Sequence, residues 1–351
     1  MITNAWKRTR PALALLASLI PALALAQSAA PANQPPGGQT TQGMPDGVPA
    51  SRIVLLGTAA GPIPRPDRAQ PANLLQVGAK TYVIDVGDNA AQQMTRAGAM
   101  VAHVTAVFLT HLHYDHTLGL GALMAFGWMN GRNAALPIWG PPGTIELVSR
   151  TAAALDISAN IFKPELPPRP ALASLYPAHD ITLDGDTPVE VYRDDQVRVT
   201  AVPNTHYATM DLPGRSYGTD QSYAYRFDTP QGSVVFTGDT GPSDAVTELA
   251  KGADVLVTEI MDLASVSAAI TQRLGARQLD GMLNHMRKEH LTAEDVGRMA
   301  QKAGVKKVIL THFSVGDAFQ PADFIPQVRQ YYPMGDIVAG TDLGAYPLRG
   351  D

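Results

Sequence analysis

The chain has 351 residues, no cysteine, and 27 basic against 32 acidic side chains, which give a formal net charge of −5. Without cysteine the chain has neither disulfide bridges nor thiolate chemistry, so any bound metal must be held by His, Asp or Glu. An acidic balance without a run of Lys or Arg argues against a surface built for a broad polyanion. We therefore expect a small-molecule substrate.

The N-terminus has the pattern of a Sec-type signal peptide. Lys7, Arg8 and Arg10 precede an apolar stretch that ends in small residues at Ala26, and cleavage is expected after Ala26. The stretch is too short for a comfortable membrane span of roughly 20 residues. We expect a periplasmic or secreted protein without a stable membrane anchor. Removal of the three basic residues would leave 24 basic against 32 acidic side chains, a formal charge of about −8.

Residues 27–50 differ in composition from the rest of the chain. They consist mainly of Pro, Gly, Gln, Ala and Ser, which bury too little apolar area to form a core, and they predict a disordered linker. Residues 51–351 contain recurrent apolar runs and are numerous enough for one large domain.

Strand and helix patterns alternate within residues 51–351. Strands are predicted at 52–57, 81–87, 104–111, 197–206, 222–228, 233–240, 254–260 and 306–313. Helices are predicted at 89–98, 117–126, 143–154, 242–251 and 293–303. Residues 139–200 show a weaker pattern, and proline argues against regular structure at 162–170. The run at 104–111 is apolar on both faces, which indicates a layered α/β structure.

Several predicted strands end in a polar residue. Those at or just beyond a strand end are His111, His206, Asp239, Glu259 and His312. A rigid scaffold can direct side chains at such ends into one cleft. The five residues therefore suggest a single site to which two half-sheets, 52–140 and 197–313, both contribute.

Residues 110–116, THLHYDH, place three histidines and an aspartate close together. Where a strand passes into a loop, His111 and His113 point the same way, and Asp115 and His116 can face the same cavity from the next turn. Imidazole and carboxylate suit a borderline-soft ion such as Zn²⁺. The spacing therefore predicts half of a metal site rather than a polar surface loop.

THLHYDH resembles the metal-binding signature of the metallo-β-lactamase superfamily. The resemblance implies an αββα sandwich of two mixed β-sheets flanked by helices, with a dinuclear metal site and a metal-bridging hydroxide. The segments PNTH, FTGDT and LTHFS match the later ligands of that family. The resemblance assigns one ion to His111, His113 and His206, the other to Asp115, His116 and His312, and a bridging role to Asp239. Two divalent ions are expected, with Zn²⁺ favoured over Mn²⁺ or Fe²⁺.

Three further segments resemble the ribonuclease Z branch of this superfamily, whose pattern is shared by related arylsulfatases. They are residues 55–75, residues 258–262 (TEIMD) and residues 289–314, which begin EHLTAEDVG. The resemblance implies catalytic roles for Asp115, for His290 as general acid or transition-state stabiliser, and for Glu259 as the partner that orients it. His285 is an alternative to His290, and a homodimer is compatible with the branch.

The substrate expectation departs from that branch. Ribonuclease Z holds transfer RNA with a basic arm, whereas residues 158–196 carry three basic and seven acidic side chains. We therefore expect a small anionic ester, an aryl sulfate or a phosphodiester, and no nucleic-acid polymer. The alternatives are a cyclic-nucleotide phosphodiesterase and a lactonase, carboxyl-ester or β-lactam hydrolase on the same metal site. Tyr207 is a candidate substrate-binding residue.

Overall fold

A computed structural model describes residues 51–61, 63–274, 279–316 and 319–348. The predicted signal peptide and linker lie outside the described residues, so export and the boundaries at 26 and 50 stay predictions. Among the described residues, no helix is both long enough and apolar enough to cross a membrane.

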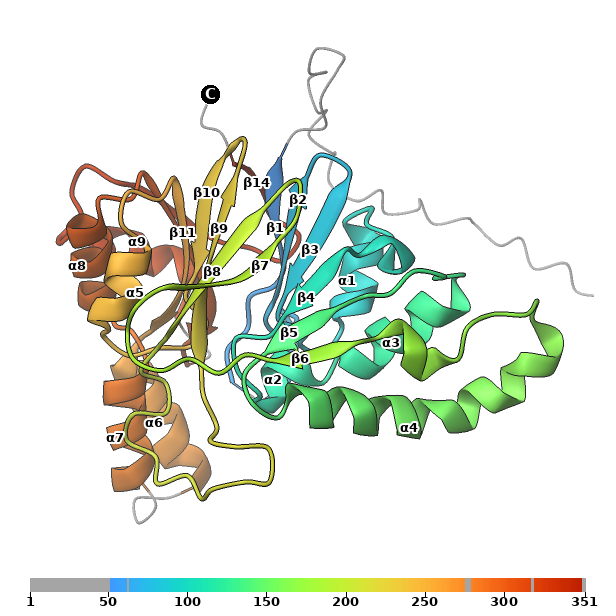
Figure 1. Cartoon of the computed structure of the whole chain (residues 1–351). Helices are drawn as coiled ribbons and strands as arrows, with labels where there is room; N and C mark the ends of the chain where they lie inside the picture. Colours follow the sequence, from blue (N-terminus) through green and yellow to red (C-terminus); the bar gives the residue numbers. More distant parts are fainter. Residues whose placement is uncertain (1–50, 62, 275–278, 317–318, 349–351) are drawn as a thin grey trace, which may run out of the picture. The chain divides into compact units, whose positions relative to one another are not determined.

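Two mixed sheets face each other in the described part of the chain (Figure 1). The strand order of the first sheet is β14-β1-β2-β3-β4-β5-β6. Its strands are β1 (Arg52–Gly57), β2 (Ala72–Val77), β3 (Lys80–Ile84), β4 (Ala106–Phe108), β5 (Ile138–Gly140), β6 (Ala178–Asp180) and β14 (Ala345–Pro347). Strands β14 to β3 pair antiparallel, and β3 to β6 pair parallel.

The second sheet repeats this arrangement, with the order β13-β12-β11-β10-β9-β8-β7. Its strands are β7 (Val189–Arg193), β8 (Arg198–Pro203), β9 (Tyr223–Thr229), β10 (Gly232–Phe236), β11 (Val255–Met261), β12 (Lys307–Ser314) and β13 (Asp336–Ala339). Strands β7 to β10 are antiparallel, and β10 to β13 are parallel. In each sheet the parallel strands end at one edge.

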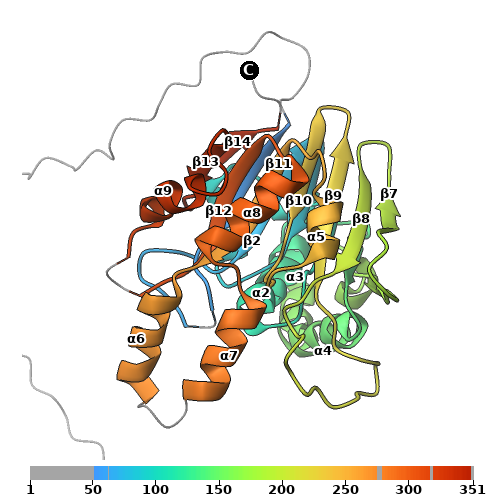
Figure 2. The same ribbon diagram turned by 90° about the vertical axis from the view of Figure 1, so that its left-hand side faces the viewer.

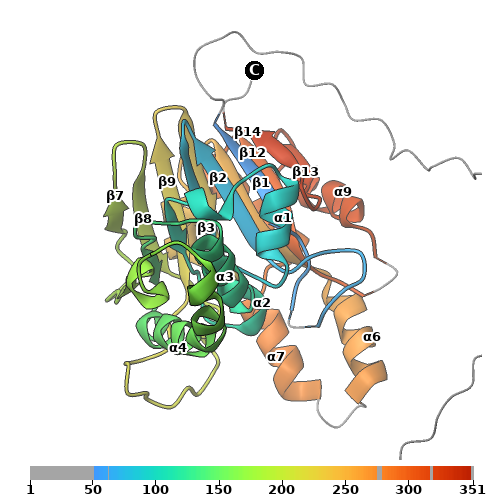
Figure 3. The ribbon, with the colours of Figure 1, turned by 90° about the vertical axis from the view of Figure 1, so that its right-hand side faces the viewer.

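Helices lie on the outer side of each sheet (Figure 1). Those beside the first sheet are α1 (Ala90–Arg96), α2 (Tyr114–Thr117), α3 (Leu120–Met129) and α4 (Thr144–Phe162). Those beside the second are α5 (Asp244–Leu249), α8 (Ala293–Ala303) and α9 (Phe324–Arg329). The pair α6 (Leu263–Leu274) and α7 (Leu279–Glu289) extends beyond the strand ends, as Figures 2 and 3 show.

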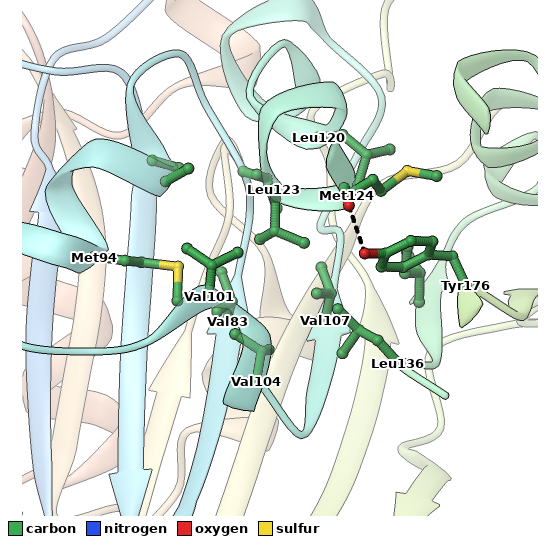
Figure 4. Packing of buried hydrophobic residues seen from close by; sticks show 14 of the residues in the cluster. Val83, Met94, Val101, Val104, Val107, Leu120, Leu123, Met124, Leu136 and Tyr176 are labelled. Atoms are coloured by element: carbon green, nitrogen blue, oxygen red, sulfur yellow. Dashed lines mark hydrogen bonds between the residues drawn. The ribbon is translucent and has the colours of Figure 1, made fainter. Parts of the chain in front are cut away.

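Three layers of apolar side chains hold the sandwich together. Along β1, Ile53 and Leu55 pack between the two sheets, whereas Val54 and Leu56 pack toward the helices. This alternation follows the two-residue period of a strand, and both faces are apolar because both are covered. Figure 4 shows part of the helix-side layer, where the Tyr176 hydroxyl donates to the Met124 carbonyl at 2.5 Å. Each buried aliphatic side chain contributes about 1.5–3 kcal/mol.

The two mixed sheets flanked by helices confirm the predicted fold class. The region 139–200 is more regular than its sequence indicates, because α4 continues to Phe162 and β7 forms an edge strand. The sequence of β7, VEVYR, is exposed at Val189, Glu190 and Arg193, so it lacks the apolar run of a central strand. Proline does prevent a longer element after Glu165, as expected.

Candidate metal centre

Seven of the nine histidines gather at the carboxyl ends of the central strands. They are linked by ring-to-ring contacts, with centroids 4.0–6.2 Å apart, and are His111, His113, His116, His206, His285, His290 and His312. His103 and His179 lie elsewhere, and the His179 ring stacks on Trp139 at 3.9 Å. The predicted convergence of strand ends from both half-sheets is therefore present.

Local backbone geometry directs these side chains into one place. His113 is the N-cap of the short helix α2, which turns Asp115 and His116 back toward His111. The pairing of β11 with β12 passes from Thr311 to Phe313 and leaves His312 in a bulge with a φ of 44°. A bulge re-aims a side chain, and a non-glycine residue at positive φ marks a position that the surrounding structure constrains.

One glycine permits the close approach of the two sheets at the site. Gly238 precedes Asp239 and has a φ of 59°. A Cβ atom at this position would lie 2.8 Å from the Thr110 Cβ atom, beside the THLHYDH segment. Glycine is therefore required here both for its backbone conformation and for space.

The first group of candidate ligands consists of three imidazoles. The His113 Nδ1 atom lies 3.1 Å from the Nε2 atom of His111 and 3.1 Å from the Nε2 atom of His206. Nitrogen ligands at bond lengths of about 2.0–2.1 Å lie roughly 3–3.4 Å apart around one ion. Burial lowers the pKa values of His111 and His206 well below the usual range, which keeps both rings neutral, as metal ligands must be.

The second group joins two imidazoles to two carboxylates. The Asp115 Oδ2 atom lies 3.5 Å from the His116 Nε2 atom and 3.4 Å from the His312 Nε2 atom. Asp239 completes this group, with carboxylate oxygens 3.3 Å from the His116 Nε2 atom and 3.1 Å from the His312 Nε2 atom. The ligand atoms of all four residues lie within 4.8 Å of one another.

Asp239 also reaches the first group. Its Oδ2 atom lies 4.0 Å from the His111 Nε2 atom and 3.9 Å from the His206 Nε2 atom. The carboxylate thus stands between the three-histidine group and the mixed group. This is the position that a bridging ligand between two ions would occupy.

Hydrogen bonds on the far side of the imidazoles fix their orientation. The His111 Nδ1 atom lies 3.0 Å from the Thr110 hydroxyl, and the His116 Nδ1 atom lies 2.8 Å from an Asp85 carboxylate oxygen. The Nδ1 atom of His206 lies 3.2 Å from the Glu289 carbonyl oxygen. Metal-binding histidines commonly donate their other ring nitrogen in this way, which sets the tautomer.

The donor set and its unpaired atoms fit divalent metal ions. Among the described residues, the buried atoms without a hydrogen-bond partner include His116 Nε2, His312 Nε2 and Asp239 Oδ1. Burial opposes protonation of His312, but Asp239 and Asp115 raise its pKa to about 10. A bound cation would neutralise the same negative charge, and the unpaired atoms could coordinate it. Histidine and carboxylate ligands suit zinc, manganese and iron.

Glu259 and His290 form a buried pair beside the metal ligands. The His290 Nδ1 atom lies 2.7 Å from a Glu259 carboxylate oxygen, and the side chains are 7% and 1% exposed. Burial alone would lower the pKa of His290, but the Glu259 carboxylate raises it above the usual value. The His290 and His206 ring centroids are 5.0 Å apart, so the pair adjoins the first ligand group. The structure thus brings together the residues that the sequence proposed as general acid and orienting partner.

Two further candidates lie at the rim of the ligand groups. The Tyr207 ring packs 5.3 Å from the His113 ring and 5.2 Å from the His206 ring, and burial raises the pKa of its hydroxyl. His285 lies on α7, with its ring centroid 5.4 Å from that of His290. The substrate-binding role of Tyr207 and the catalytic roles of Asp115, His290 and Glu259 stay predictions.

Sequence reasoning missed Asp85 and Glu289. Asp85 follows β3 with a φ of 61°. Its carboxylate accepts hydrogen bonds from the Thr110 N–H and the Thr110 hydroxyl, and it also contacts the His116 Nδ1 atom. Its place at a strand end, in the run TYVIDVG, was an available signal. Glu289 directly precedes His290, but no sequence pattern indicates that its carboxylate is fully buried.

Two facing sheets that hold His and Asp ligands at the carboxyl ends of their central strands define a metal-dependent hydrolase of the metallo-β-lactamase type. Residues 80–313 match the beta-lactamase superfamily domain. The chain is also 31% identical to the ribonuclease Z of Mycobacterium bovis (strain BCG / Pasteur 1173P2) over 274 residues, covering 74% of this chain and 85% of the relative. The chain therefore belongs to the metallo-β-lactamase superfamily, in its ribonuclease Z-like branch.

Solved structures of other proteins share this fold. The metallo-beta-lactamase fold protein YhfI from Bacillus subtilis superposes with a TM-score of 0.59 at 18% identity, covering 85% of this chain and 99% of that one. The short form of human tRNase Z gives a TM-score of 0.59 at 18% identity, again covering 85% of this chain and 99% of that one. At this identity the structural likeness establishes the fold alone.

These relatives correct the expected substrate. Curated relatives named ribonuclease Z contradict both the expected small anionic ester, such as an aryl sulfate, and the expected exclusion of a nucleic-acid polymer. The same names count against the lactone, β-lactam and cyclic-nucleotide alternatives. The error came from treating residues 158–196 as a substrate-holding arm. In the structure the acidic Asp194 and Asp195 contact Lys80, and Glu190 contacts Arg193 and Arg198. Three of the seven acidic side chains of this region are therefore ion-paired within the fold.

Proposed function

We propose that the protein is a metal-dependent ribonuclease that hydrolyses a phosphodiester bond in RNA. The observation that carries the proposal is the buried Glu259–His290 pair beside two complete groups of metal ligands. The metal-ligand groups supply the general hydrolytic machinery of the superfamily. The pair supplies a proton donor, which a phosphodiester needs when its alkoxide leaving group departs.

His111, His113 and His206 would hold one divalent ion, and Asp115, His116 and His312 the other, with Asp239 between them. We propose Zn²⁺ as the ion, since three imidazoles form the first group. When bound, the ions would activate a water molecule and offset negative charge on the phosphate.

His290 performs the proton transfer in this proposal. Its Nδ1 atom is held by Glu259, so its Nε2 atom is the one that faces the substrate. Because the Glu259 carboxylate raises the pKa of the imidazole, His290 keeps a proton near neutral pH. The Nε2–H group can then donate that proton to the departing ribose oxygen.

Positive charge for an RNA backbone is available near this site despite the acidic composition. Arg287 and Lys288, in the last turn of α7, are exposed, and they lie between His285 and His290 in the chain. Cationic side chains near a phosphate contribute salt-dependent affinity without reading sequence.

The test is cleavage of a precursor transfer RNA carrying a 3′ extension by the full chain loaded with Zn²⁺. The proposal predicts discrete cleavage that a chelator abolishes and that Asp239→Ala loses. An aryl sulfate and a β-lactam serve as comparison substrates. Turnover of either one together with an intact RNA would contradict the proposal.

A further inference from the structure

A second carboxylate–imidazole pair, His285 and Glu289, stands beside the Glu259–His290 pair. Both residues lie on α7, four positions apart, so they face the same side of the helix. The His285 Nδ1 atom contacts a Glu289 carboxylate oxygen. The Glu289 side chain is fully buried, whereas the His285 side chain is 23% exposed. The carboxylate is therefore inside the fold, and the imidazole reaches the rim of the site.

Glu289 is held from its other side by the loop that follows His206. Its second carboxylate oxygen accepts hydrogen bonds from the backbone N–H of Thr209, at 2.5 Å, and from the Thr209 hydroxyl. The Glu289 carbonyl oxygen also accepts from the His206 ring. These contacts join α7 to the ligand loop and fix the position of His285 relative to the metal ligands.

The hydrogen-bond partner determines which nitrogen His285 presents. A carboxylate oxygen can only accept, so the Nδ1 atom of His285 carries the hydrogen. The neutral ring then offers the lone pair of its Nε2 atom to the site. One ring nitrogen from each of His206, His285 and His290 lies within 4.8 Å of the others, so the His285 ring adjoins the Glu259–His290 pair that donates the proton in the proposed function.

Two possible ligands of this lone pair differ in how well they fit. A metal ion is disfavoured, because His206 already directs its Nε2 atom to His113 and both metal-ligand groups are complete without His285. A phosphate oxygen is excluded, because it is itself an acceptor. The donor that an RNA chain carries beside each phosphate is the ribose 2′-hydroxyl, and this group is what distinguishes RNA from DNA.

We propose that His285, oriented by Glu289, accepts a hydrogen bond from the 2′-hydroxyl of a nucleotide flanking the scissile phosphate and so makes the enzyme selective for RNA. This inference rests on the proposed ribonuclease function. It assigns His285 a contact with substrate and Glu289 a positioning role.

The experiment compares three precursor RNAs with the holoenzyme: an all-ribose substrate and two substrates that carry a single 2′-deoxynucleotide, one on each side of the cleavage site. The native enzyme should lose about three- to tenfold in kcat/KM on one deoxy substrate, the effect of one neutral hydrogen bond. His285→Ala should lose a similar factor on the all-ribose RNA and show no further loss on the deoxy substrate. The exposed His103 provides the matched control, and His103→Ala should behave as the native enzyme.

Two variants separate substrate contact from structural support. His285→Gln retains an acceptor on a flexible side chain, so part of the discrimination between ribose and deoxyribose should return. Glu289→Gln removes the obligate acceptor and should reduce this discrimination, which a purely structural defect would leave unchanged. Metal content should stay at the native value in His285→Ala.

The results that overturn the inference differ from those that overturn the proposed function. If the native enzyme cleaves the RNA and His285→Ala keeps full discrimination, or loses metal, the role of His285 as a 2′-hydroxyl acceptor is wrong. If the native enzyme cleaves no RNA, the ribonuclease proposal itself fails.

Discussion

At the scale of single residues, a buried carboxylate outside the two ligand groups orients a metal-binding imidazole. Asp85 is separated from His116 by 31 positions in the chain, yet the two side chains lie 2.8 Å apart. The site therefore depends on this contact as well as on the ligands themselves.

Replacement of Asp85 by Asn should weaken metal binding while leaving every ligand in place. Asn removes the charge that holds the His116 Nδ1 atom and sets its tautomer. Loss of such a supporting partner typically lowers metal affinity by about 10- to 100-fold. The measurement is competition for Zn²⁺ with a chelator of known affinity, and unchanged affinity would show that Asp85 does not orient His116.

Replacement of His290 by Ala should slow turnover while the metal content stays at the native level. Loss of a general acid costs about 10²- to 10⁴-fold in kcat. A pH profile adds a second readout, because the Glu259 carboxylate raises the pKa of His290. The fall in native activity with rising pH should begin above the usual histidine range and should disappear in the variant. Loss of metal in His290→Ala would instead make this residue a ligand.

The metal ligands themselves were predictable from the sequence because their pattern is local. Four of them lie within THLHYDH, and the others end strands that apolar runs identify. Asp85 and Glu289 were not predictable in the same way, because their roles depend on which histidine lies beside them after folding.

At the scale of elements, α8 was the most predictable helix, since its ends are encoded by side chains. Thr292 accepts from the Asp295 N–H, the Asp295 carboxylate accepts in return, and Gly304 ends the helix with a φ of 66°. The edge strand β7 and the pair α6–α7 gave weaker signals. Their residues are partly exposed and polar, and contacts with the rest of the fold determine their structure.

Thr292→Ala should destabilise the folded chain by about 1 kcal/mol, the usual cost of an N-cap. The capping box lies two residues after His290, so the loss should also increase local opening at the site. Urea denaturation of the metal-free protein measures the first effect. Thr292→Ser keeps the cap and is the control; equal losses in both variants would contradict a capping role.

A polar cluster around Asp194 ties β3 to the turn between β7 and β8. The Asp194 carboxylate accepts from the Tyr82 hydroxyl at 2.8 Å and from the Val197 N–H at 2.9 Å, and it contacts Lys80. Burial opposes ionisation, but the Gln196 N–H and Lys80 lower the pKa of Asp194 below its usual value. Its stabilising effect is therefore present above the unfolded pKa, near 4, and is lost as pH falls through the folded pKa.

Asp194→Asn should accordingly cost about 1–3 kcal/mol at neutral pH and less as the pH falls below 4. The measurement is the free energy of unfolding of native and variant proteins at several pH values, with chelator present so that metal binding does not contribute. A difference between the two proteins that is constant with pH would contradict this assignment.

At the scale of the described molecule, the site exists because two similar sheets pack face to face and the carboxyl ends of their central strands lie side by side. The first supplies the four THLHYDH ligands, and the second supplies His206, Asp239 and His312, up to about 200 residues later in the chain. Periodicity and the resemblance predicted this arrangement. Net charge did not predict the substrate, because it also counts acidic side chains, such as Asp194, that form ion pairs away from the site.

A titration of the metal-free full chain with Zn²⁺, in which bound metal and cleavage of the precursor RNA are followed together, tests whether two ions form the hydrolytic centre. Cleavage should rise to a plateau at two ions per chain, and Asp239→Ala should reach neither this stoichiometry nor this activity. RNA cleavage that is complete without metal, or a chain that binds two ions and leaves the RNA intact, would contradict this expectation.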